Sequence, residues 1–378
     1  MAEARNSHCA IHEEEHSMKP LTSSKSSRSF PKLLAATGTV LLALLCATNL
    51  QAKQSASHEL KLTPSSTDYA AAGAAKNQKI HARPAHTAAG RSTGLAAISN
   101  SPNVTATVAP FAAPDSGGPR YPADLQYHGG HVVPFMQHHA IYMNPNGGCT
   151  IASCWGDPEG FLRDLGLSNF IHVVDQYTDG SGPYTVSNTH FTVNYHPNAA
   201  PFTDADMLAI VHAAASFTGQ AGYGNEYHVF LPPGQDECFN LGYKVCYSPD
   251  DPKTFIFCAY HGSADFSDIG HVLYSVEPFQ DSVGCSSRPG TPNGQVADST
   301  NNVLSHEVFE TITDPDGTAW WNSLDNGLFG QEIGDECSFL LFTATNVYFD
   351  PSNVTLNGKA YVAQPEYDNA AHACTTSP

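Results

Sequence analysis

An uncharged apolar run near the N-terminus, residues 33–50, constrains this chain more than any other feature. Four basic residues precede it: Lys19, Lys25, Arg28 and Lys32. A basic segment, an apolar segment and then small residues at a cleavage site are typical of a secretory signal peptide. We therefore predict that residues 1–52 form a leader cleaved after Ala52. The rest of the chain is expected to fold outside the cytoplasm, in a periplasm or fully secreted.

The leader is not expected to anchor the mature protein. Its apolar run is close to the lower length for crossing a bilayer and is diluted by Ala, Thr and Gly. We therefore expect no stable membrane insertion after signal cleavage. Met18 followed by Lys19 makes a better start for a signal peptide than Met1, so the true start could be Met18.

The segment after the leader differs in composition from the remainder. Residues 53–119 are rich in Ala, Ser, Thr and Pro, with few large apolar residues and no sustained period. Such a segment cannot bury enough apolar surface to offset the entropy lost on ordering. We predict a disordered linker or prosegment there, followed by one globular domain over residues 120–378.

The cysteines fit an exported protein. Ten are present, and eight remain once Cys9 and Cys46 are removed with the leader. An even number behind a signal peptide indicates disulfides rather than thiolate metal ligands, and no C-x-x-C pair occurs. Sequence alone does not fix the connectivity. Our hypothesis pairs neighbours in order: Cys149 with Cys154, Cys238 with Cys246, Cys258 with Cys285, and Cys337 with Cys374.

The charge of the chain excludes two classes of partner. Seventeen Lys and Arg against 36 Asp and Glu give a formal net charge of −19 among 378 residues. Nucleic-acid binding needs a basic face that displaces phosphate counterions, and adhesion to anionic lipid needs basic clusters. We predict neither activity.

Periodicity predicts helices and strands without a regular βαβ alternation. Helices are expected within Asp157–Tyr177, from the N-cap Thr203 through Phe217, and from about Ser299 or Asn302 to Asp314. Strands are expected as follows: a pair within His131–Tyr142, then His190–Tyr195, Tyr227–Leu231, Thr254–Tyr260, His271–Val276, Phe339–Phe349 and Lys359–Gln364. The pattern favours the α+β class: a single disulfide-bonded domain with a mixed sheet.

The stretch with the clearest chemistry is Ser305-His306-Glu307-Val308-Phe309-Glu310. His306 and Glu310 are four residues apart and share one face of a helix. The spacing matches H-E-x-x-H, in which two helix residues hold zinc and the intervening Glu is the general base, except that Glu replaces the second His. Zinc accepts a carboxylate oxygen at about 2.0–2.2 Å. We predict His306 and Glu310 as metal ligands and Glu307 as the catalytic base, with Zn²⁺ as the ion and Ca²⁺ as the alternative.

A third ligand must come from outside this helix. The acidic turn Glu332-Ile333-Gly334-Asp335-Glu336 supplies Asp335 or Glu332 as the preferred candidates. His261, at the end of an expected strand, is the other candidate.

Three further residues are assigned supporting positions. Asp314 is eight residues from His306, about 12 Å of helix rise, so both cannot bind one ion and Asp314 is expected to cap the helix or support a ligand. Trp320 and Trp321 lie between the helix and the acidic turn, where they could line a substrate cleft.

Each of these features also has a purely structural interpretation. H-E-x-x-E occurs at solvated helix ends, His261 could bond only to backbone, and the tryptophans could be packing residues. The remaining histidines are interpreted as surface residues: His138, His139, His190 and His196. The G-x-S-x-G match at residues 90–94 lies in the expected linker, which offers no strand and helix for a nucleophile elbow. No nucleotide-binding glycine motif is present.

A series of short motifs also resembles a known group of proteins. They are NEYHVFLPPG (225–234), FCAYHG (257–262), NVLSHEVFETITDP (302–315), AWW (319–321) and EIGDEC (332–337). Together they resemble exported bacterial proteins of unassigned function and are distantly similar to plant phosphate-induced, EXORDIUM-type secreted proteins. The resemblance spans about 124–374. It implies an extracytoplasmic domain and a zincin-like role for the helix that carries His306, Glu307 and Glu310.

The leading hypothesis is therefore a secreted metal-dependent hydrolase, a zinc metallopeptidase acting on extracellular peptides or proteins. Its rival is a non-catalytic secreted or cell-wall-associated binding module with a structural metal or none. A third hypothesis is a carbohydrate-binding or carbohydrate-active protein that uses Trp320 and Trp321.

Overall fold

The structure is a computed structural model that describes residues 55–85, 87, 104–108, 123–143, 148–194, 201–239, 242–323, 331–338 and 353–378. Within it, Gln54–Pro378 forms one compact unit. The predicted signal peptide, its cleavage site after Ala52 and the strand predicted at Phe339–Phe349 lie outside the described residues. None of the helices in the described ranges combines the length and apolarity needed to cross a membrane.

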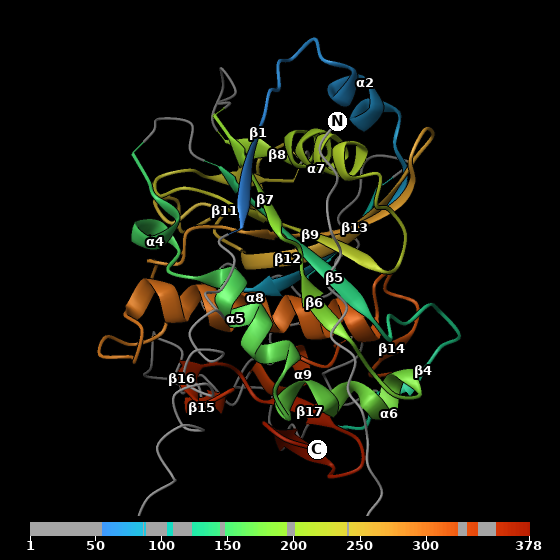
Figure 1. Cartoon of the computed structure of the whole chain (residues 1–378), viewed down its shortest axis with the longest axis vertical. Helices are drawn as coiled ribbons and strands as arrows, with labels where there is room; N and C mark the ends of the chain where they lie inside the picture. Colours follow the sequence, from blue (N-terminus) through green and yellow to red (C-terminus); the bar gives the residue numbers. More distant parts are fainter. Residues whose placement is uncertain are drawn as a thin grey trace, which may run out of the picture. The chain divides into compact units, whose positions relative to one another are not determined.

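A mixed β-sheet lies at the centre of this unit (Figure 1). Its strand order is β1-β7-β5-β9-β13-β12-β2-β3, and β6 pairs with β5. The strands are β1 (Ala56–Leu60), β2 (Lys76–Pro84), β3 (Val104–Val108), β5 (Met136–Met143), β6 (Tyr184–Val186), β7 (Thr189–Val193), β9 (Asn225–Phe230), β12 (Phe257–Phe266) and β13 (Gly270–Glu277). Strands β12 and β13 form an antiparallel hairpin, β2 is antiparallel to β12, and the other pairs are parallel. The predicted mixed sheet is therefore confirmed.

Helices cover both faces of the sheet (Figure 1). On one face α7 (Asp204–Thr218) packs against β9 and β13, and α2 (Thr67–Ala74) packs on α7. On the other face α8 (Gln295–Thr313) packs against β12 and β13, with α5 (Pro158–Gly166) and the 3-10 helix η2 (Phe170–Val174) beside it. Two separate apolar clusters result, one on the α7 side and one on the α8 side.

Local sequence explains where the helices begin and end. Helix α7 starts at the predicted N-cap, because Thr203 and Asp206 form a reciprocal capping box, and it ends at Gly219 with a φ of 65°. The helix predicted within Asp157–Tyr177 is α5, and the same range also contains η2 and the start of α6 (Asp175–Thr178). Helix α5 ends where the Ser168 hydroxyl bonds to the carbonyl of Leu165 at 2.7 Å, a local bond that competes with a continuous helix.

The smaller elements lie around this core. They are β4 (Gln126–Tyr127) paired with β14 (Trp320–Trp321), β8 (Phe202–Thr203) and β11 (Cys246–Tyr247) paired with β10 (Glu237–Cys238), β15 (Asn353–Leu356) paired with β16 (Lys359–Val362), β17 (Glu366–Asp368) paired with β18 (Ala373–Thr375), and the short helices α4 (Ile151–Cys154) and α9 (Asp335–Ser338). The strand pair predicted within His131–Tyr142 is wrong, because this segment supplies the single strand β5.

The predicted linker over residues 53–119 is wrong wherever the structure describes it as an element. Strand β1 pairs with β7, β2 pairs with β12, β3 pairs with β2, and α2 packs on α7. Ile80 and Ala82 of β2 enter the apolar cluster on the α7 side and are at most 4% exposed. The folded unit therefore begins well before residue 120. Composition did not predict these strands, because they gain their stability from pairing with distant parts of the chain.

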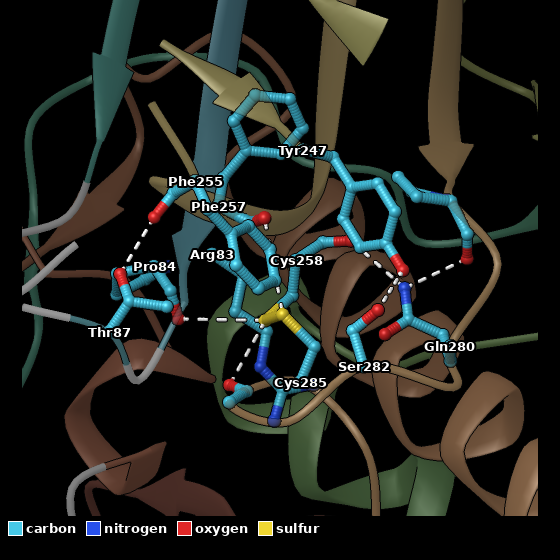
Figure 2. Close-up of a disulfide and its surroundings, with 12 residues drawn as sticks. Arg83, Pro84, Thr87, Tyr247, Phe255, Phe257, Cys258, Gln280, Ser282 and Cys285 are labelled. Carbon is cyan, nitrogen blue, oxygen red and sulfur yellow. Dashed lines mark hydrogen bonds between the residues drawn. A yellow bond between two sulfur atoms is a disulfide. The ribbon is translucent and has the colours of Figure 1, made fainter. Parts of the chain in front are cut away.

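The four disulfides are those predicted, pairing neighbouring cysteines in order. Figure 2 shows Cys258–Cys285, which lies beside Arg83 and Pro84 at the end of β2. The Gln280 amide donates to the carbonyl of Cys258 at 2.9 Å and further fixes the start of β12. Four disulfides in one folded unit fit an extracellular or other oxidising location.

Candidate metal centre

Helix α8 carries the H-E-x-x-E residues in a buried position. His306 and Glu307 are fully buried and Glu310 is 1% exposed. The helix ends at Asp314, whose carboxylate accepts the backbone N–H groups of Thr318 and Ala319 at 2.6 and 2.7 Å. The side chain of Asp314 therefore closes the turn after the helix, and its backbone N–H, which donates to the carbonyl of Glu310 at 2.7 Å, caps the helix end.

The acidic turn brings the preferred third ligand to this helix. Nε2 of His306 lies 3.0 Å from Oε1 of Glu310 and 3.7 Å from Oδ1 of Asp335. The backbone N–H of Asp335 donates to Oε1 of Glu310 at 3.2 Å. Gly334 allows the approach, because a Cβ there would lie 2.4 Å from Nδ1 of His306. His306, Glu310 and Asp335 thus form one group whose ligand atoms lie close enough to share a metal ion.

The other predicted ligand, His261 of β12, completes a second group. Its Nδ1 lies 3.4 Å from Oε2 of Glu307 and 3.5 Å from Oε2 of Glu310. Glu310 therefore belongs to both groups, with one carboxylate oxygen toward His306 and the other toward His261. Glu332 lies at the far side of the imidazole, 3.8 Å from Nε2 of His261. We call these six residues the α8 centre: His261, His306, Glu307, Glu310, Glu332 and Asp335.

Many polar atoms of the α8 centre have no hydrogen-bond partner. They are both ring nitrogens of His261, Nε2 of His306, both carboxylate oxygens of Glu307, Oε1 of Glu332 and Oδ1 of Asp335. The 3.0 Å contact between His306 and Glu310 is close, but the atoms are not aligned for a hydrogen bond. A buried polar atom without a partner costs about 1–3 kcal/mol, and more when it is charged. Carboxylates and imidazoles converging without mutual hydrogen bonds have the arrangement of metal ligands.

Acidic groups outnumber the basic groups around the α8 centre. Arg83 of β2 is fully buried, donating to Oε1 of Gln364 at 3.1 Å and to the carbonyl of Asn302 at 3.4 Å. Burial lowers the pKa of Arg83 to about 10, although Glu307 and Glu366 oppose the change. Arg83 and the histidines face seven buried carboxylates: Glu277, Glu307, Glu310, Asp314, Glu332, Asp335 and Glu366. A buried acidic excess of this kind requires protonation of some carboxylates or a bound cation.

The carboxylates respond to this crowding in different ways. Burial raises the pKa of Asp335 well above its usual value, and the charges of Glu310 and Glu307 add to the effect. Burial also raises the pKa of Glu307. Burial opposes ionisation of Glu310 too, but His306 and His261 hold the pKa of Glu310 well below its usual value. Glu310 is thus the carboxylate held ionised at the junction of the two groups.

Gln364 fixes the orientation of the His306 ring. Its amide nitrogen lies 3.1 Å from Nδ1 of His306 and also donates to the carbonyl of Gly334. Because an amide N–H only donates, this orientation makes Nδ1 an acceptor and leaves the ring proton of a neutral His306 on Nε2. Metal binding at Nε2 therefore requires this proton to leave and the Gln364 amide to turn.

Trp320 and Trp321, which the sequence analysis placed beside a substrate cleft, form strand β14. Trp320 lines a pocket of about 230 Å³ with Tyr127 and Tyr177, and its indole N–H donates to the carbonyl of Tyr177 at 2.8 Å. Trp321 stacks on His128, with ring centroids 3.6 Å apart.

Two of the histidines interpreted as surface residues are in fact buried. His138 is 2% exposed and His139 is fully buried, while the His190 side chain is 12% exposed and lies 3.3 Å from Glu159. His196 lies outside the described residues. The error has one cause: a strand alternates its side chains between two faces, and sequence does not say whether the polar face meets solvent or another layer.

Sequence reasoning also missed residues that surround the α8 centre. His81 and Arg83 come from the segment taken for a linker, and Gln364 lies between β16 and β17, at the end of a predicted strand that was assigned no role. A weak signal was present, because Ile80 and Ala82 alternate with His81 and Arg83 as in a strand. Burial lowers the pKa of His81 to about 3, with the neighbouring His261 as a further cause.

Comparison with known proteins gives no independent assignment: no protein family, curated protein or solved structure matches this chain.

Proposed function

We propose that the protein is an extracytoplasmic metal-dependent hydrolase, a zinc peptidase, that uses the α8 centre. The observation that carries the proposal is the convergence of His306, Glu310 and Asp335, in which Nε2 of His306 and Oδ1 of Asp335 are buried and have no hydrogen-bond partner. The donor set of one imidazole and two carboxylates suits Zn²⁺, and oxygen-rich sites also accept Ca²⁺. The disulfides, the signal-like leader and the motif resemblance to exported bacterial proteins support the location.

The two overlapping groups suggest different roles for their residues: one group would hold the ion, and Glu307 would act on the attacking water. An ion held by His306, Glu310 and Asp335 leaves Glu307 and His261 as a neighbouring pair, 3.4 Å apart. A bound Zn²⁺ supplies Lewis-acid chemistry at the scissile carbonyl. Glu307 would take the proton of the attacking water, with Nδ1 of His261 3.4 Å from its carboxylate. The raised pKa of Glu307, caused by burial, strengthens it as a base relative to an exposed carboxylate.

The test is the Glu307→Gln variant of the full chain, incubated with a pooled peptide digest that is read by mass spectrometry. Loss of a general base is expected to slow cleavage by about 10²–10⁴-fold while the zinc content stays unchanged. Glu237→Gln is the matched control, because Glu237 is also fully buried but lies in β10 and accepts from Tyr260. Unchanged cleavage by Glu307→Gln contradicts the assigned role.

A non-catalytic binding module is the second candidate, favoured by two observations. The donors of the α8 centre are almost completely enclosed, and Gln364 holds the His306 ring with its proton directed at the carboxylates. In that case an ion held by His261, Glu307 and Glu310 would consume Glu307 as a ligand and be purely structural. Zinc or calcium would then raise the melting temperature by mass action, with no peptide cleaved by the wild type.

A further inference from the structure

A second group of metal-type ligands lies on strands away from the α8 centre. His138 of β5, Glu226 and His228 of β9 are at most 2% exposed, and their ligand atoms lie close enough to share an ion. In the parallel pairing of β5 and β9, His138 lies opposite Glu226, and His228 is two residues further along β9 on the same face. We call these three residues the β5–β9 triad.

The distances within this triad match the spacing of zinc ligands. Nδ1 of His138 and Nε2 of His228 are 2.9 Å apart, and each lies 3.6 Å from Oε2 of Glu226. A point equidistant from three atoms at these separations lies about 2.0 Å from each, which is the bond length of Zn²⁺ to imidazole nitrogen and carboxylate oxygen. The three atoms therefore surround a position that fits a zinc ion.

The carboxylate oxygen that faces this position has no other partner. Oε2 of Glu226 makes no hydrogen bond, and its 3.6 Å separation from both imidazoles is too long for one. The other oxygen, Oε1, accepts the hydroxyl proton of Thr311 from α8 at 2.7 Å. Glu226 is thus held in place by one oxygen while the other is left available.

The surrounding hydrogen bonds prepare His228 as a ligand. Nδ1 of His228 lies 2.8 Å from the Ser275 hydroxyl, which donates its proton to Glu277 at 2.9 Å. Because the hydroxyl proton is used, Nδ1 of His228 must be the donor in its contact with Ser275. The lone pair of a neutral His228 is then on Nε2, where it accepts the Nδ1–H of His138 at 2.9 Å, a proton that an ion bound between the two rings would displace. A ligating histidine whose other nitrogen donates to a fixed acceptor is the usual outer shell of a metal site.

We propose that His138, Glu226 and His228 bind a second divalent transition-metal ion, Zn²⁺ by their donor set, in a structural site that ties β5 and β9 to α8 through Thr311. Two imidazoles and one carboxylate are a ligand set that Zn²⁺ and Fe²⁺ both accept. The site is assigned a structural role because all three ligands are enclosed by the sheet and α8. It does not depend on the function proposed for the α8 centre.

The test is the number of zinc ions per full-length chain, measured by elemental mass spectrometry after equilibration with Zn²⁺ and desalting. The same measurement reports iron. We expect His228→Gln to hold one ion fewer than the wild type. His139→Gln is the matched control, because His139 is equally buried in β5 but faces Tyr227 on the α7 side and should leave the count unchanged. An equal count in His228→Gln and wild type overturns the proposal.

Two further measurements distinguish loss of the β5–β9 ion from loss of the α8 ion and from misfolding of the variant. The double variant His306→Ala, Glu310→Ala should retain the ion of the β5–β9 triad, so the two sites are counted separately. If His228→Gln does not fold, anomalous diffraction at the zinc edge from zinc-equilibrated wild-type crystals decides the question. A peak between His138, Glu226 and His228 supports the site, and its absence there overturns it.

Discussion

Both faces of the central sheet bury apolar side chains, but only the face under α8 also buries a dense set of imidazoles and carboxylates. The face under α7 is apolar and aromatic: Ile80, Ala82, Tyr227, Val229, Tyr260, Tyr274 and Val276. The alternate residues of these strands, under α8, include His81, Arg83, Glu226, His228, His261, Ser275 and Glu277. The helices differ in the same way: α7 buries mainly apolar residues such as Met207 and Ile210, while α8 buries His306, Glu307 and Glu310 in addition to apolar residues.

We infer from this difference that the α7 face contributes mainly to stability and that the α8 face also carries the functional groups. Burying charged groups costs free energy that an apolar core of the same shape does not incur. The α8 face keeps its imidazoles and carboxylates at that cost, which is the pattern expected of a site that binds an ion. The predictions below test this division, from the largest expected effect to the smallest.

The largest loss of stability is expected from Arg83→Met. This change keeps most of the side-chain volume but removes the buried guanidinium that faces Glu307, Glu310 and Glu366. Breaking a buried charge network by removing one partner costs about 3–5 kcal/mol. Urea denaturation measures the effect, and Arg83→Lys, which keeps a charge, should lose less. If Arg83→Met unfolds at the wild-type urea concentration, the carboxylates do not depend on this cation.

A smaller loss, about 3 kcal/mol, is expected from Ile210→Ala in α7, because Ile210 is fully buried in the apolar cluster. The metal content should not change, since the sheet separates Ile210 from both proposed sites. Ile210→Val should lose only about 1 kcal/mol. A folded Ile210→Ala protein that has lost its metal would contradict the division between the two faces.

The smallest effect concerns a partly exposed ion pair at the rim of the α8 face. His271 lies 2.8 Å from Asp265 and 3.3 Å from Asp316, and its side chain is 21% exposed. Burial alone would lower the pKa of His271, but hydrogen bonds to Asp316 and Asp265 raise it above 6.5. The pair therefore contributes its full stabilisation below pH 6.5 and loses it as the pH rises through the higher folded pKa.

His271→Gln checks this sign. The difference in unfolding free energy from the wild type should be largest at pH 5.5 and shrink toward pH 8.5, and it should stay below about 1 kcal/mol because solvent screens the pair. A difference that grows with pH would show that His271 is not protonated in the folded protein at low pH.

Several parts of the fold could be predicted because their causes are local. The capping residues Thr203 and Asp206 fix the start of α7, and Pro315 follows the end of α8 directly. Short connections bring two of the cysteine pairs together, Cys149–Cys154 and Cys238–Cys246, which are 5 and 8 residues apart in the sequence. The H-E-x-x-E spacing placed His306 and Glu310 on one helix face, and the acidic turn supplied Asp335.

The remainder depends on pairings between distant parts of the chain. Strand β2 carries Arg83 in a nine-residue segment that is mostly polar and lies between stretches rich in Ala, Ser and Thr, so composition did not reveal its pairing with β12. His138 and His228 lie in strands that were recognised, but their burial depends on α8 covering that face of the sheet. Register and layer order decide such contacts, and neither is encoded locally.

The most direct test of the central claim is the zinc content of the full chain beside that of the His306→Ala, Glu310→Ala double variant. The matched control is His372→Ala, whose side chain is 71% exposed and contacts only Asp124 among the described interactions. We predict that the wild type and the control bind zinc and that the double variant holds one ion fewer. Equal zinc in all three proteins, or none in any of them, would contradict a metal centre on α8.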